Sequence, residues 1–161
     1  MLFDKDRPKL LIADDEEYVR SLLKNITESI KFDVVGEASN GQIALELFRE
    51  HTPDVMILDL NMPKISGDEL LEIIKDEIEH TCIVIMTSSI DDENIAKCTE
   101  LGAKQFIRKD TPLYKMAKII NDAWRTFESK RTVLEVEKYD LNELLQEIKE
   151  DKIIANISNI T

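Results

Sequence analysis

Short apolar runs alternate with longer amphipathic segments through the first 128 residues of the chain. Most of the runs are rich in β-branched residues and nearly all apolar, as is typical of strands that helices cover on both faces. The intervening segments repeat apolar residues at helical spacing. The predicted strands are Leu10–Ala13, Val34–Ala38, Val55–Leu58, Ile83–Met86 and Gln105–Ile107. This alternation predicts an α/β fold, a doubly wound five-stranded parallel sheet with right-handed crossovers and helices on both faces.

Several helix ends are marked by local signals. An Asn40-Gly41 turn precedes the second helical segment, and Gly102 follows the fourth as a favoured residue after a helix C-terminus. Thr111 is predicted as the N-cap of the fifth helix, with Pro112 at its first position. Because ligands bind beyond the carboxyl ends of the strands in sheets of this kind, we expect the functional residues there.

Residues 129–161 differ from the part before them. No Gly or Pro follows Pro112, so the fifth helix can continue past Phe127. A further helix is predicted from Asp140, where Asp140 and Glu143 have capping-box spacing. Its apolar stripe is Leu141, Leu144, Leu145 and Ile148, and the final KIIANISNIT has no clear period. We therefore expect a domain of residues 1–128 and a helical C-terminal extension of residues 129–161, which is too short and too acidic for a helix-turn-helix.

Composition narrows the class of protein. The chain has 161 residues, 43% of them hydrophobic and 34% charged, as in an ordinary globular domain. Its formal net charge of −12 argues against direct binding to nucleic acid. No apolar run has the roughly 20 residues of a membrane span, and MLFDKDRPK is no signal peptide, so a cytoplasmic location is expected. Cys82 and Cys98 are predicted to be small buried residues, with no disulfide or metal role.

Four polar patches follow the ends of predicted strands. They are Asp14 with Asp15 and Glu16, then Asp59, then Thr87 with Ser88, and finally Lys109. Each alone has an ordinary interpretation, because acids cap helices, a Thr after a strand is usually a turn residue and a lone Lys is usually solvated. Their joint occurrence at carboxyl ends indicates a functional site instead.

The chemistry of the four patches is that of phosphoryl transfer. Mg²⁺ prefers oxygen ligands, and the carboxylates of Asp14, Asp15 and Asp59 can converge if the first and third strands are neighbours. Asp59 can also act as a nucleophile, since carboxylates form acyl phosphates. Thr87 can donate a hydrogen bond to a phosphoryl oxygen, and Lys109 supplies a fixed positive charge.

These residues resemble the receiver domain of two-component response regulators. The resemblance covers about residues 8–128 and depends on LLIADDEE, EASNGQIALE, MILDLNMPKISG, IVIMTSS and ELGAKQFIRK, whose order and spacing match. It implies a flavodoxin-like sheet of order 2-1-3-4-5. It also implies that Asp59 is the phosphoacceptor, with a sensor histidine kinase or a phosphotransfer protein as donor.

The resemblance implies further roles at the site. Asp15 and Asp59 would ligate Mg²⁺ (or Mn²⁺) directly together with the backbone carbonyl of Asn61, and Asp14 would act mainly through water. Thr87 and Lys109 would contact the phosphoryl oxygens. Phe106 sits where the family has a switch aromatic that turns inward as Thr87 moves toward the phosphate. The family commonly has Lys-Pro at the last patch, whereas this chain has Lys109-Asp110, for which a trans bond is expected.

The expected function is a switch that binds a downstream protein. The family's output surface is formed by the fourth helix, the fifth strand and the fifth helix; a homodimer is a further assembly that the sequence leaves open. Enzymatic activity would be limited to self-phosphorylation from a phosphodonor and slow autodephosphorylation. One alternative is an aspartate-nucleophile phosphohydrolase of the haloacid-dehalogenase type, which wants an Asp where this chain has Asn61. Another is a receiver that docks partners independently of phosphorylation.

Overall fold

All five predicted strands are present in the computed structural model, which describes residues 7–149. The strands are β1 Lys9–Ala13, β2 Asp33–Ala38, β3 Val55–Asp59, β4 Cys82–Thr87 and β5 Ala103–Arg108. Each exceeds the predicted run by one to three residues, because residues at the strand ends, most of them polar, still pair with the neighbouring strand. Every residue of β3 and β4 is buried, as expected of central strands covered on both faces.

The sheet is parallel and has the order β2-β1-β3-β4-β5. This confirms the predicted doubly wound topology. From β1 the chain moves outward to β2 and then returns past β1 to β3, so the direction of winding reverses between β1 and β3. In sheets of this kind ligands bind at this reversal, beyond the carboxyl ends of the two strands, a region called the crevice.

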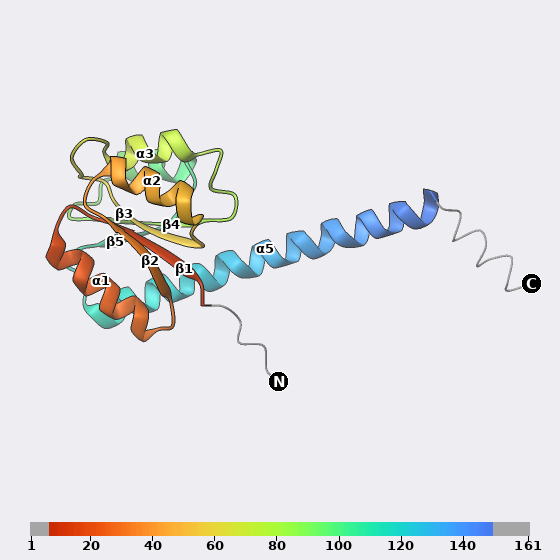
Figure 1. The fold of residues 1–161 in the computed structure, drawn as a ribbon, viewed down its shortest axis with the longest axis horizontal. Helices are drawn as coiled ribbons and strands as arrows, with labels where there is room; N and C mark the ends of the chain where they lie inside the picture. Colours follow the sequence, from red (N-terminus) through yellow and green to blue (C-terminus); the bar gives the residue numbers. More distant parts are fainter. Residues whose placement is uncertain (1–6, 150–161) are drawn as a thin grey trace, which may run out of the picture. The chain divides into compact units, whose positions relative to one another are not determined.

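The sheet is covered by helices on both faces. The helices are α1 Glu17–Ser29, α2 Gly41–His51, α3 Gly67–Ile74, α4 Asp92–Glu100 and α5 Leu113–Lys149. Figure 1 shows α2 and α3 over one face of the sheet, with α1 and the beginning of α5 over the other. Phe48 of α2, Leu70 of α3 and Cys98 of α4 share one buried cluster with β3 and β4, which places α4 on the same face as α2 and α3. Two apolar layers therefore hold the sheet in place.

The helix ends follow the sequence signals with one exception. The Asn40 side chain accepts a hydrogen bond from the Ile43 N–H (2.9 Å), and Gly102 has a φ of 107° after α4. The first residue of α5 is Leu113, and the Pro112 carbonyl accepts the Met116 N–H (3.0 Å). Pro112 is thus the N-cap residue, and the prediction of Thr111 was one position early.

The chain divides into two compact units, Met1–Arg125 and Thr126–Thr161. In the second unit the described residues, 126–149, continue α5, which confirms the predicted continuation past Phe127. The prediction of a separate helix from Asp140 was wrong, since this residue lies inside α5 and nothing there breaks the helix. The side chains of Leu144 and Ile148, and the KIIANISNIT segment from residue 152 on, lie outside the described part.

Two further expectations concern the cysteines and the membrane. Cys82 and Cys98 are free and buried, as predicted, and burial raises the pKa of the Cys82 thiol to about 12. The charge of Lys104 acts in the opposite direction and lowers the pKa of that thiol. Among residues 7–149, none of the helices combines the length and the apolar character that crossing a membrane requires.

Candidate functional site

Asp59 is a buried carboxylate at the end of the most central strand. It is the last residue of β3, directly after four buried apolar residues, and its exposure is 1%. Its Oδ1 accepts a hydrogen bond from the Asn61 N–H (3.1 Å). Burial raises the pKa of Asp59 to about 6, and the charge of Asp14 adds to the rise, while the Asn61 N–H and Lys109 oppose it. The sequence thus places an acid with a raised pKa in the crevice.

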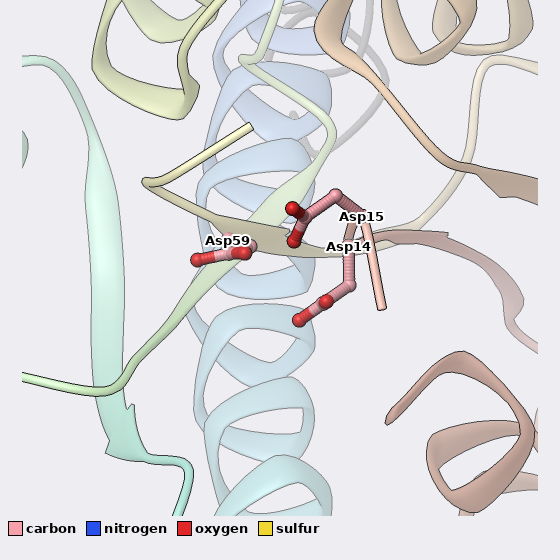
Figure 2. A group of neighbouring side chains, drawn as sticks. All are labelled: Asp14, Asp15 and Asp59. Atoms are coloured by element: carbon pink, nitrogen blue, oxygen red, sulfur yellow. The ribbon is translucent and has the colours of Figure 1, made fainter. Parts of the chain in front are cut away.

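Asp14 and Asp15 follow β1, the neighbour of β3. Asp14 is 1% exposed, and its Oδ1 accepts the Glu16 N–H (2.8 Å), whereas Asp15 is exposed. The Asp14 backbone is fixed as well, because its carbonyl accepts a hydrogen bond from Arg20 Nη1 (2.9 Å). Figure 2 shows both carboxylates extending toward Asp59. One oxygen of each of the three residues lies within 4.8 Å of the others.

Lys109 brings a positive charge to these acids from the end of β5. Its Nζ lies 2.9 Å from Asp14 Oδ2, 3.1 Å from Asp59 Oδ2 and 2.8 Å from Glu16 Oε1. Burial lowers the pKa of Lys109, but the hydrogen bond to Glu16 and the charges of Asp14 and Asp59 outweigh it and raise the pKa overall. The ammonium is therefore charged at neutral pH. No peptide bond among residues 7–149 is cis, so Lys109-Asp110 is trans as expected.

The carboxylates fit a divalent cation. The buried Asp14 Oδ2 has the Lys109 ammonium as its partner, at 2.9 Å. A single ammonium contacts Asp14, Glu16 and Asp59, and Asp15 adds one more acid beside them. Negative charge is thus in excess, and oxygen donors of this kind are the ligands that Mg²⁺ and Mn²⁺ accept. Asp14, Asp15 and Asp59 are the residues that would hold such an ion.

Thr87 lies on β4, the strand beside that of Asp59, and Phe106 lies on β5, the next strand. Asp59 pairs with Met86 in the sheet, so Thr87 is the next residue along β4, and it is 3% exposed. Its hydroxyl donates to the Ser89 carbonyl (3.1 Å), and its own carbonyl accepts the Lys109 N–H (2.9 Å). Phe106 pairs with Ile85 and packs half-buried against the core. Thr87 is thus at the crevice, whereas Phe106 is within β5.

Two residues have a role at the site that sequence reasoning did not assign. Glu16 occupies the N-cap position of α1, but its side chain makes no capping bond and pairs with Lys109 instead. Gly67 begins α3 where that helix passes the backbone of Asp59: a Cβ at this position would lie 2.2 Å from the Asp59 carbonyl oxygen. The presence of a third acid after β1 was a signal for the role of Glu16, whereas the close approach at Gly67 has no signal in the local sequence.

Replacing Gly67 with alanine is expected to destabilise the protein by about 2–3 kcal/mol, because the backbone around Asp59 must move to admit a methyl group. Gly36→Ala is the matched control, since its Cβ would meet only side-chain methyl groups of Leu11 and Leu47, at 3.2 Å. Urea unfolding of both variants measures the difference. Equal losses in the two variants would contradict the close approach as the cause.

Comparison with known proteins supports the same assignment. Residues 10–121 match the family described as "Response regulator receiver domain". The chemotaxis protein CheY of Bacillus subtilis is 34% identical over 114 residues, which cover 70% of this chain and 94% of that protein. The transcriptional regulatory protein YdfI of the same organism is 40% identical over 104 residues, 64% of this chain. The chain spans about half of YdfI, since the match covers 48% of it.

A solved structure agrees with the fold. The signal receiver domain of the putative response regulator NarL from Mycobacterium tuberculosis has a TM-score of 0.68 and 26% identity, and the alignment covers 74% of this chain and 98% of that one. The hydrolase alternative loses its basis, because the family match spans well over half of the chain and includes every candidate residue. The chain belongs to the response regulator receiver family.

Proposed function

We propose that this receiver accepts a phosphoryl group on Asp59, with the help of Mg²⁺, and that the phosphorylated form binds a partner protein. The donor is a phosphohistidine on a sensor histidine kinase or on a phosphotransfer protein. The observation that carries the proposal is the position of Asp59: it is buried at the crevice, 3.1 Å from the Lys109 ammonium and within 4.8 Å of the Asp14 and Asp15 carboxylates.

The transfer is a displacement at phosphorus. A carboxylate oxygen of Asp59 forms a bond to phosphorus while the bond to the donor's imidazole nitrogen breaks. The electron pair of the broken bond stays with the imidazole, which takes up a proton, and Asp59 becomes an acyl phosphate. The signal ends by hydrolysis: water attacks the phosphorus atom of the acyl phosphate, and inorganic phosphate and the free Asp59 carboxylate result.

The surrounding residues position the phosphoryl group and balance its charge. Asp14, Asp15 and Asp59 would hold Mg²⁺ with the carbonyl of Asn61, and the ion would neutralise charge on the phosphoryl oxygens. Lys109 already contacts Asp59 Oδ2 and can move the short distance to a phosphoryl oxygen. The Thr87 hydroxyl now donates to Ser89 and would have to break that bond to reach the phosphoryl group.

The same movement would connect phosphorylation to a partner surface. Thr87 leads into the segment before α4, and Phe106 on the neighbouring β5 would turn inward as Thr87 moves. The proposed surface combines α4, β5 and the beginning of α5. Its support in the structure is exposure: two large apolar side chains at the start of α5, Leu113 and Tyr114, are 47% and 72% exposed.

The test is incubation with acetyl phosphate and Mg²⁺, followed by intact mass measurement. We expect one phosphoryl adduct in the wild type, none in Asp59→Asn and none when the metal is chelated. Asp33→Asn is the matched control, because Asp33 is an exposed acid at the start of β2, the opposite edge of the sheet. An adduct that survives Asp59→Asn contradicts the phosphoacceptor. Absence of any adduct in the wild type favours a receiver that docks partners without phosphorylation.

A further inference from the structure

The segment from Thr126 to Lys149 has an apolar stripe that the receiver chemistry does not use. Five of its large apolar side chains are about half exposed, in contrast to Ile120 and Trp124 earlier in the same helix, which are 0% and 8% exposed. The exposed residues are Val133, Leu134, Val136, Leu141 and Leu145. A row of this kind on a helix usually packs against another surface.

The spacing of the row is that of a coiled coil. Steps of three and four residues alternate along α5 in a series that begins at Ile120 and continues through Trp124, Phe127, Arg131, Leu134, Lys138, Leu141 and Leu145. In heptad terms Leu134 and Leu141 occupy d positions and Leu145 an a position. Val133 and Val136 lie outside this series, at the outer c and f positions of the heptad. We call the residues of this series the seam, and its exposed apolar members are Leu134, Leu141 and Leu145.

The charges beside the seam fit a second copy of the same helix. When two such helices run parallel in register, the g position of one lies beside the following e position of the other. This places Lys130 beside Glu135 of the partner subunit, and Glu137 beside Asn142 of the partner subunit. All four residues are exposed in the chain. Lys130 and Glu135 are oppositely charged, as in the salt bridges between helices that set partner choice and orientation in coiled coils.

The residues at the seam also limit the number of strands. A basic residue at an a position can specify the register and the number of strands at a cost in stability, and this seam has two of them, Arg131 and Lys138. We propose that residues 126–149 pair with the same segment of a second chain as a parallel two-stranded coiled coil. This pairing does not need a phosphorylated Asp59 and holds the receivers of two chains together in both states.

The first test compares two double variants of the full chain by sedimentation equilibrium over a dilution series, without Mg²⁺ or phosphodonor. The wild type is expected to have the mass of two chains. Leu134→Glu with Leu141→Glu places charges in the seam and is expected to raise the dissociation constant at least about 100-fold. Val133→Glu with Val136→Glu adds the same charges to equally exposed apolar positions outside the seam and is expected to leave the dimer intact.

The second test reverses one charge pair. Lys130→Glu alone and Glu135→Lys alone each bring like charges together and are expected to weaken the dimer, whereas the double exchange is expected to restore it. Restoration would show pairing between two chains aligned in parallel. Thermal unfolding of the receiver confirms that each variant is folded.

Several results would overturn the proposal. One is a wild type with the mass of a single chain throughout the dilution series. Another is a dimer that survives both leucine substitutions, since the contact would then lie elsewhere in the molecule. A third is equal weakening by the valine pair, and a fourth is failure of the double charge exchange to restore the dimer. All four results can also be measured by sedimentation equilibrium in the Asp59→Asn variant, so they do not depend on the proposed phosphorylation.

Discussion

Replacing Lys109 with methionine is expected to slow phosphorylation of Asp59 by acetyl phosphate about 100- to 1,000-fold, the loss seen when one preorganised donor is removed from an active site. The structure supplies the reason. The Lys109 ammonium lies 3.1 Å from Asp59 Oδ2 and 2.9 Å from Asp14 Oδ2, so it is already in place where charge develops on the phosphoryl oxygens. Methionine has a similar length and no charge. Intact mass measured over time gives the rate.

The control is a lysine on β5, the strand that Lys109 directly follows. Lys104 of β5 is exposed, and Lys104→Met removes the same charge from the protein without touching the crevice. We expect its rate to match the wild type. Because Lys109→Met leaves Asp14 and Asp59 buried without their counter-ion, the variant is assayed with saturating Mg²⁺ and its folding is checked by thermal unfolding. A rate within a factor of about three of the wild type would exclude a direct role for the ammonium.

Most of the architecture could be predicted because the responsible forces act along the sequence. A central parallel strand is buried on both faces and must be apolar throughout, as in the VMIL run before Asp59. Where such a run ends in an acid, the acid lies at the carboxyl edge. The polar residues at the ends of four parallel strands lie along the same side of the sheet. Asp14, Asp59, Thr87 and Lys109 could therefore be placed near one another before any distance was known.

What could not be predicted depends on contacts between distant residues. Glu16 is 93 residues from Lys109 in the chain, and the usual preference of acids for helix N-termini gave a sufficient local explanation for it. The need for Gly67 arises from the approach of α3 to the Asp59 carbonyl, which no local pattern reports. Asp140 shows the opposite error. The capping-box spacing at Asp140 is a local signal for a helix start. The helix nevertheless continues through Asp140, because no Gly or Pro interrupts it.

The pKa of Asp59 leads to a dependence of stability on pH that can be measured without any phosphodonor. The folded state holds the Asp59 proton with a pKa of about 6, against an ordinary value of 3.8. Between these values the folded protein binds more protons than the unfolded chain, so the free energy of unfolding falls as the pH rises. Asp59→Asn has no such proton. Relative to that variant, the wild type is expected to lose up to about 3 kcal/mol between pH 4 and pH 7 in the absence of metal.

Urea unfolding of both proteins at several pH values measures this difference, with Asp33→Asn as the control for loss of an exposed acid. The wild type and Asp59→Asn should be similar in stability near pH 4, and the variant should be the more stable one at pH 7. Mg²⁺ should then stabilise the wild type at pH 7 and reduce the gap, because an ion that binds only the folded state offsets the repulsion among Asp14, Asp15 and Asp59. A gap that does not change with pH would show that Asp59 is ionised in the folded protein at an ordinary pKa. In that case Lys109 alone would already compensate the buried charge, and the need for a cation at this crevice would lose its physical basis.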